Sequence, residues 1–192
     1  MKKFTLVAAL MVLLCGTSLA AKEFDWSQCW CNYGGGIKQG DFIVNADLGL
    51  FYEDFDYNYI EGYWFLPPVM VEVQYAQPIW KLPFTFGGYV GLHGWGYNYS
   101  YKVGGETHHT KDTFMTLFFG GEAAYHIQMP PKGLDLYAVT RFGVNIPLKN
   151  SYYNDYVHFG EALGANWFFT DFIGVNFEIG YPFTKLGATF KF

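Results

Sequence analysis

The stretch that decides the fold is FIGVNFEIGY, residues 172–181. From Ile173 to Tyr181 every odd-numbered residue is apolar or aromatic, and every even-numbered residue is glycine, asparagine or glutamate. After Pro182 the alternation resumes in residues 184–192, now with the apolar residues at even positions. A period of two predicts β-strands that have one apolar face and one polar face.

Two such strands in succession need partners along their edges, because an unpaired strand edge invites aggregation. A closed barrel removes the edges, and an apolar outer face suits a barrel that lies in lipid. Aromatic residues make up 22% of the chain and charged residues only 15%, whereas a soluble domain carries about 25% charged residues. The alternative, a soluble lipocalin-like binding barrel, needs a charged outer face that this composition does not supply.

The first twenty residues have the pattern of a secretory signal peptide. Lys2 and Lys3 precede an apolar run at 4–14, which is too short to span a bilayer, and small residues follow up to Ala20. Loss of the two lysines takes the formal net charge from −5 to −7, which argues against a nucleic-acid partner. Residues 21–40 show no alternation, and we expect an irregular periplasmic segment, either a tail or a plug.

The barrel is expected to occupy residues 41–192. Prolines punctuate this region and predict connections or strand ends. We predict eight strands, at 41–51, 69–78, 83–97, 113–127, 134–146, 157–168, 172–181 and 184–192. Long connections (52–68, 98–112 and 147–156) alternate with short ones (79–82, 128–133 and 169–171). This alternation is typical of an outer-membrane barrel, which has long loops outside and tight turns in the periplasm. The predicted fold is an all-β, eight-stranded antiparallel up-and-down transmembrane β-barrel.

The chain resembles the small eight-stranded outer-membrane proteins of the OmpA/OmpX/OmpW-like group. The resemblance is carried by the signal peptide, the strand count, the hairpin sequence GANWFFTD at 164–171 and the terminal Phe190-Lys191-Phe192. It implies a monomer in the bacterial outer membrane, with outer-membrane lipids and the barrel-insertion machinery as partners. It also implies that Phe190 and Phe192 form the assembly signal.

In such a barrel the polar faces point inward, and six charged residues fall at similar heights. We predict that they form a charged layer in the lumen: Asp47, Glu72, Glu122, Arg141, Glu178 and Lys185. Buried charges at this density must be paired. The layer therefore plugs the lumen or lines a narrow passage for protons or small solutes. Glu161 falls on the lipid face of a regular strand, so it lies above the membrane or a bulge near Gly160 shifts the register.

Other candidate chemistry is weaker. Cys29 and Cys31 are separated by one residue, so a strained or intermolecular disulfide, free thiols and a metal site all remain open. His108-His109 is expected to be a solvated loop pair. A lipid-modifying enzyme, of the acyltransferase or deacylase type, would need a serine, a histidine and a carboxylate near the outer rim. Ser100 and His109 share the second predicted long loop, and His158 follows Ser151 of the third, but neither pair matches a recognised spacing.

The sequence therefore predicts a non-enzymatic outer-membrane protein without a metal or other cofactor. Its role is expected to lie in envelope structure, surface contact or limited, porin-like passage of a small solute. A surface ligand or a small solute would be the partner beyond the membrane itself. The lipid-modifying enzyme and the soluble binding barrel are the alternatives.

Overall fold

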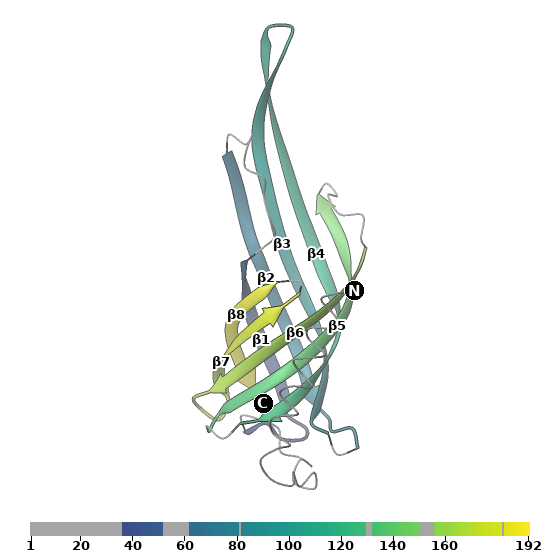
Figure 1. Ribbon diagram of the computed structural model, residues 1–192, viewed down its shortest axis with the longest axis vertical. Helices are drawn as coiled ribbons and strands as arrows, with labels where there is room; N and C mark the ends of the chain where they lie inside the picture. The colour runs from purple at the N-terminus through teal and green to yellow at the C-terminus, as the bar shows by residue number, and fades with distance from the viewer. Residues whose placement is uncertain (1–35, 52–61, 81, 130–131, 150–155, 182) are drawn as a thin grey trace, which may run out of the picture.

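The computed structural model describes residues 36–51, 62–80, 82–129, 132–149, 156–181 and 183–192. They form one closed barrel in which each strand pairs antiparallel with the next and β1 pairs with β8 (Figure 1). The strands are β1 (Phe42–Phe51), β2 (Gly62–Ala76), β3 (Phe84–Val103), β4 (Glu106–Gln128), β5 (Leu134–Lys149), β6 (Val157–Phe168), β7 (Ile173–Gly180) and β8 (Thr184–Lys191). The predicted all-β, eight-stranded antiparallel barrel is confirmed. In the described part of the chain, no helix has the length and apolar character needed to cross a membrane.

The two faces of the sheet have opposite chemistry, as β7 illustrates. Val175, Phe177 and Ile179 point outward and are 41%, 40% and 58% exposed. Between them, Asn176 and Glu178 point inward and are 0% and 1% exposed. The alternation of the sequence therefore places apolar side chains outside the barrel and polar ones in its lumen.

The longest hairpin corrects one prediction. Residues 98–112 were expected to form a loop, but β3 continues to Val103 and β4 begins at Glu106. Only Gly104 and Gly105 lie between the strands, with φ of 62° and 90°, a conformation that glycine adopts without strain. The hairpin projects well beyond the rest of the barrel (Figure 1).

The chemistry of the faces changes along this hairpin. Beyond Gly94, the face that continues the lumen carries Trp95, Tyr97, Tyr99 and Tyr101, whose neighbouring rings lie 5.6–6.0 Å apart between centroids. Phe114 of β4 stacks on Trp95 at 4.2 Å. The opposite face carries Asn98 and Ser100, so the outer face of the hairpin is polar, whereas the outer face of the lower barrel is apolar.

Two proline sites correct the predicted strand limits. Pro67-Pro68 lies within β2, where the pairing with β3 shifts register between Leu66 and Val69. Pro147 lies within β5, opposite Thr116 at another register shift. In both places an irregularity accommodates residues that lack an N–H donor. The predicted loops at 52–68 and 147–156 are therefore shorter than expected.

The position of Glu161 is settled by the register of β6. β5 and β6 pair without a shift from Leu134–Trp167 to Val144–Val157, with Glu161 opposite Thr140. The bulge expected near Gly160 as one alternative is therefore wrong. Glu161 stays on the outer face, and its carbonyl accepts a hydrogen bond from the Tyr181 N–H just past the end of β7.

The described residues 36–41, which precede β1, pack against the lower end of the barrel. Ile37 is 2% exposed and packs with Ile43, Ala76 and Phe168. The Lys191 ammonium donates to the Gly36 carbonyl at 3.0 Å and lies 4.7 Å from the Phe168 ring centroid. The predicted signal peptide, the rest of the segment up to residue 35, and Cys29 and Cys31 lie outside the described residues.

Candidate functional site

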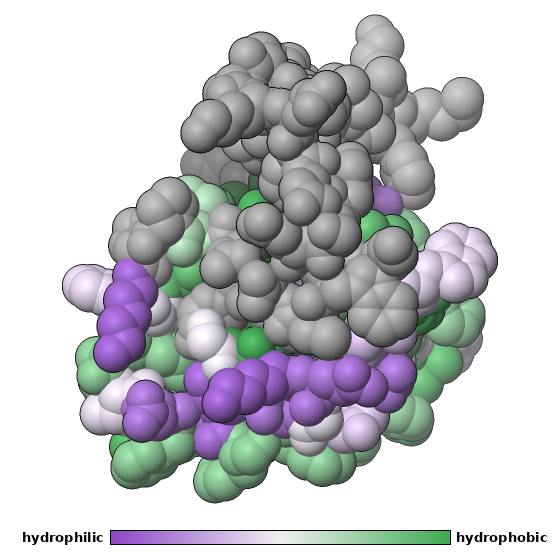
Figure 2. Space-filling model, turned by 90° about the horizontal axis from the view of Figure 1, so that it is seen from below, coloured by the Kyte–Doolittle hydropathy of each residue, from purple (hydrophilic) through white to green (hydrophobic). Residues whose placement is uncertain are grey.

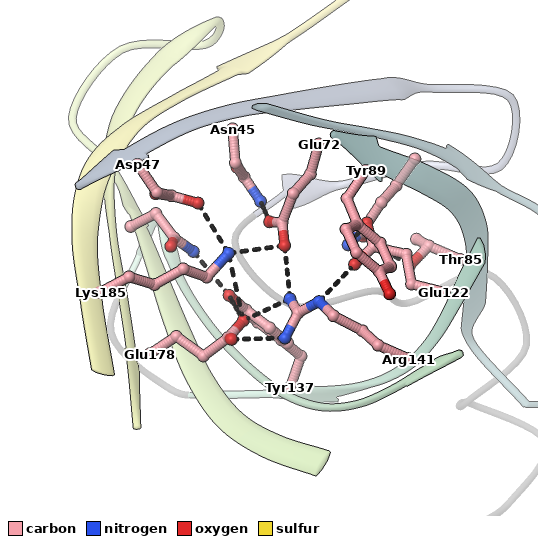
Figure 3. A network of polar contacts seen from close by, with 12 residues as sticks. Asn45, Asp47, Glu72, Thr85, Tyr89, Glu122, Tyr137, Arg141, Glu178 and Lys185 are labelled. Carbon is pink, nitrogen blue, oxygen red and sulfur yellow. Dashed lines mark hydrogen bonds and ion pairs between the residues drawn. The ribbon is translucent and has the colours of Figure 1, made fainter. Parts of the chain in front are cut away.

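The centre of the lumen is organised by Arg141 of β5, which is 2% exposed. Its Nε donates to Glu122 Oε2 at 2.9 Å, and its Nη1 donates to Glu178 Oε1 at 2.6 Å. Its Nη2 donates to Glu72 Oε1 at 2.5 Å and to Glu178 Oε2 at 2.8 Å. One guanidinium therefore binds carboxylates from β2, β4 and β7 (Figure 3).

Lys185 of β8 is the second cation of the network and is 0% exposed. Its Nζ lies 2.7 Å from Asp47 Oδ2, 2.6 Å from Glu72 Oε1 and 3.5 Å from Glu178 Oε2. The structure thus brings together all six residues of the sequence-predicted layer. Four carboxylates face two cations, so the layer has a formal charge of −2 if all six side chains are ionised.

Neutral side chains extend this network toward the lower end of the barrel. Asn45 donates to Glu72 Oε2 at 3.0 Å, and Gln74 donates to Glu122 Oε1 at 2.9 Å. The Tyr137 hydroxyl donates to Glu178 Oε2 at 3.1 Å and accepts from Asn176 Nδ2 at 2.6 Å. These contacts supply the additional hydrogen bonds that buried ion pairs require.

A second buried group was missed in the sequence. Thr85 Oγ1 lies 3.0 Å from His126 Nε2, and His126 Nδ1 lies 2.9 Å from Asp135 Oδ2. The order of hydroxyl, imidazole and carboxylate matches that of a catalytic triad. However, the three side chains are 0%, 1% and 0% exposed, and the Thr85 hydroxyl donates its hydrogen to Gln74 Oε1 at 2.8 Å. A buried hydroxyl committed to another acceptor serves the hydrogen-bond network and is not presented to a substrate.

Apolar layers lie above and below the charges. Above them, Met70, Tyr89, Phe118 and Phe183 pack together, each at most 5% exposed. The Tyr89 ring lies 5.9 Å from Arg141 Cζ, and its hydroxyl lies 2.6 Å from His158 Nε2. Below the charges lies the cluster around Ile37. The described residues thus enclose the charged layer between two apolar groups.

The serine–histidine pairs expected in loops have different settings. Ser100 and His109 face each other across β3 and β4, with Ser100 Oγ 2.6 Å from His109 Nδ1 at an exposed site. His108 stacks on Tyr101 at 5.4 Å. Neither histidine is in a loop, because the hairpin is extended up to its two-residue turn. Ser151 lies outside the described residues, and His158 points into the lumen.

The terminal aromatics lie at the seam of the barrel. Phe190 sits opposite Val44 of β1 and Ile173 of β7. Phe192 exchanges two backbone hydrogen bonds with Phe42, each of 2.9 Å, and its side chain is 72% exposed. The backbone of Phe192 therefore helps to close the barrel while its ring remains available.

Comparison with protein-family models, with curated proteins and with solved structures finds no match for this chain. Within the described ranges, no three His, Cys, Asp or Glu side chains are grouped so that they could hold a metal ion. The function must therefore be inferred from the barrel itself. Its geometry supports charge pairing in the lumen and display of a long hairpin.

Proposed function

We propose that the protein is a monomeric outer-membrane β-barrel with a closed lumen, which acts in envelope structure and in contact at the cell surface. One observation carries the proposal: the barrel has an apolar outside and a charged, hydrogen-bonded inside. A soluble barrel has the opposite arrangement, because its outer face must be solvated. Apolar side chains are exposed on every strand. Such a surface is energetically favourable only where lipid or another apolar partner covers it.

The distribution of exposed aromatic residues agrees with this proposal. Tyr75, Trp167 and Phe172 lie near the lower ends of their strands, and Tyr181 lies near an upper end. Aromatic rings at both ends of an apolar band are typical of barrels whose ends meet the two membrane interfaces. Viewed from below, apolar side chains outline the rim, and hydrophilic ones gather on the face turned to the viewer (Figure 2).

The packing of the lumen favours a structural role over solute passage. A lumen of eight strands is just wide enough for side chains. Here Arg141 and Lys185 together bind four carboxylates, and apolar groups lie on both sides of that layer. A passage would require several of these ion pairs to separate together, at a large cost in a low-dielectric interior.

The β3–β4 hairpin supports the surface-contact part of the proposal. Above Asn98, which pairs with Gly62, the two strands pair only with each other among the described residues. This extension presents Tyr97, Tyr99 and Tyr101 on one face. If the start of β1 and the end of β8 face the periplasm, the extension would lie outside the cell.

Three experiments test the proposal. The folded protein should be recovered in the outer-membrane fraction and migrate in a heat-modifiable manner on gels, whereas a soluble periplasmic monomer would contradict the membrane assignment. Reconstituted into planar bilayers, it should show no steady conductance. A steady, ion-selective current in the wild-type protein would favour the passage alternative. A protease added to intact cells should cleave the protein at a protease site inserted between Gly104 and Gly105, because the hairpin is expected to be exposed at the cell surface.

A further inference from the structure

Four buried side-chain oxygen atoms on adjacent strands lack a hydrogen-bond partner among the described residues. They are Asn45 Oδ1 and Asp47 Oδ1 of β1, Asn176 Oδ1 of β7 and Thr189 Oγ1 of β8. The four residues are at most 3% exposed. Buried oxygens without a partner are costly, so their presence on neighbouring strands calls for an explanation.

The register brings these residues side by side. Asn45 lies opposite Thr189 across the β1–β8 seam, and Asp47 lies opposite Gly187. Asn176 lies opposite Gly187 from the other side, across β7 and β8. A Cβ at Gly187 would overlap Asp47 Oδ1, so the missing side chain lets the carboxylate lie directly against β8. The four residues therefore lie together at positions 187–189 of β8 and beside them on β1 and β7, on the inner face of the barrel.

The orientations of these side chains are fixed by their other contacts. Asn45 Nδ2 donates to the Glu72 carboxylate, so a flipped amide would place oxygen against oxygen. Asn176 Nδ2 donates to the Tyr137 hydroxyl and to Asn166 Oδ1 at 2.7 Å. Asp47 uses Oδ2 for Lys185. In these three residues the other polar atom of the side chain is engaged, and the remaining oxygen is an acceptor without a donor.

The charge balance of the layer also favours a bound cation. The neighbouring layer has four carboxylates and two cations, and thus a deficit of two positive charges if all are ionised. The four oxygens comprise one carboxylate, two amides and one hydroxyl, which are hard ligands of the kind that alkali and alkaline-earth cations prefer. Because the only carboxylate among them is already paired with Lys185, the set suits a single positive charge better than a double one.

We propose that Asn45, Asp47, Asn176 and Thr189 bind a sodium ion in the lumen, beside the charged layer. The ion would satisfy oxygens that the protein leaves unpaired and reduce the negative charge of the layer. The proposal does not depend on the barrel lying in a membrane. Its failure would therefore leave the proposed outer-membrane function untouched.

The test is the dependence of unfolding on the identity of the cation. The full-length protein, folded in detergent micelles, is unfolded by urea in NaCl, KCl or choline chloride at equal ionic strength. Above the dissociation constant, stability should rise with the logarithm of the Na⁺ concentration, because the ion binds the folded state. Choline, which is too large for the site, should give only the screening response. An equal change in stability in NaCl and in choline chloride would overturn the proposal. Water or protons would then satisfy the four oxygens.

A single substitution sharpens the test. Thr189→Val removes one proposed ligand but no hydrogen bond made by the described residues, so the barrel should still fold. The variant should raise the Na⁺ concentration at which stabilisation is half complete by about tenfold or more, as expected for the loss of one good contact. Thr189→Ser should restore the wild-type concentration. Thr140→Val, on the exposed outer face, is the matched control and should leave the Na⁺ response unchanged. An unchanged Na⁺ response in Thr189→Val, or broadening of the ²³Na resonance that persists in that variant, would contradict the proposed site.

Discussion

At the scale of single residues, the shape of Arg141 matters as much as its charge. Its three nitrogen atoms contact Glu72, Glu122 and Glu178, which come from three different strands. A planar guanidinium offers such a fork of donors, whereas the ammonium of lysine is a single point of charge. A lysine at this position would keep the charge but could not reproduce the set of contacts.

We expect Arg141→Ala to lower the free energy of unfolding by about 3–5 kcal/mol, because removing one side of a buried ion pair leaves the other uncompensated. Urea unfolding in micelles, followed by circular dichroism, measures the loss. The loss should be smaller at acidic pH than at neutral pH, since the unpaired carboxylates of the variant can then take up protons. Lys132→Ala, at an exposed cation outside the lumen, is the control. Wild-type stability of Arg141→Ala at neutral pH would leave the charged layer without a stabilising role.

The residues of the charged layer could be found in the sequence, but their partners could not. The alternation with a period of two identifies which residues point inward. Counting residues from the strand ends gives their approximate heights in the barrel. Which side chains meet depends on the stagger between strands, which the sequence does not state. Thr85, His126 and Asp135 were missed for this reason. Each lies near the end of its strand and belongs to a group only after β3, β4 and β5 are aligned.

At the scale of elements, β7 offers a direct comparison of the two faces. Val175→Arg should cost about 2–4 kcal/mol if the outer face meets the middle of a bilayer. Asn176→Arg should instead disturb the lumen, because Asn176 contacts Tyr137 and Asn166. Its effect should depend on pH through the nearby carboxylates, and that of Val175→Arg should not. Unfolding in bilayers of one lipid composition at two pH values measures both, and equal, pH-independent losses would contradict the assignment of faces.

The full length of the β3–β4 hairpin could have been predicted from the sequence. The alternation of aromatic and small or polar residues continues from Trp95 to Lys102, and the following Gly104-Gly105 is a strong signal for a two-residue turn. The outward residues of this stretch are polar, unlike the apolar outer face expected of a barrel in lipid. Above the level of the apolar band, however, water covers the outer face, so a polar residue there is compatible with a strand.

Shortening this hairpin should not damage the barrel. Removing residues 99–102 together with 107–110 keeps the turn, the inward and outward order and every β2–β3 pair. We expect the same urea midpoint and the same heat-modifiable migration as in the wild type, with loss of any surface contact that the extension makes. Failure of this variant to assemble would show that the extension is part of the folding unit.

At the scale of the whole molecule, Phe192 contributes to the closure of the barrel. Deleting Phe192 should reduce assembly in cells, but it also removes the two backbone bonds to Phe42. Phe192→Ala keeps those bonds and removes only the ring, so the two variants separate closure from recognition by the insertion machinery. If the ring is the assembly signal, both variants should reach the outer membrane poorly, whereas refolding of purified Phe192→Ala in micelles should be normal. Normal assembly of Phe192→Ala in cells would argue against the terminal aromatic as a signal.

The seam between β1 and β8 also affects the rates of folding and unfolding. Seven of the eight strand pairs join neighbours in the chain, whereas the Asp47–Lys185 contact joins residues 138 positions apart. Contacts between distant residues carry the largest entropic cost of loop closure, and chains rich in them fold slowly. We therefore expect the seam to form last, when the seven neighbouring pairs have already brought β1 and β8 close together, so that the Asp47–Lys185 ion pair forms after the rate-limiting barrier. Asp47→Asn should then speed unfolding and hardly change the refolding rate, so this ion pair would set how long the barrel stays shut more than how quickly it forms.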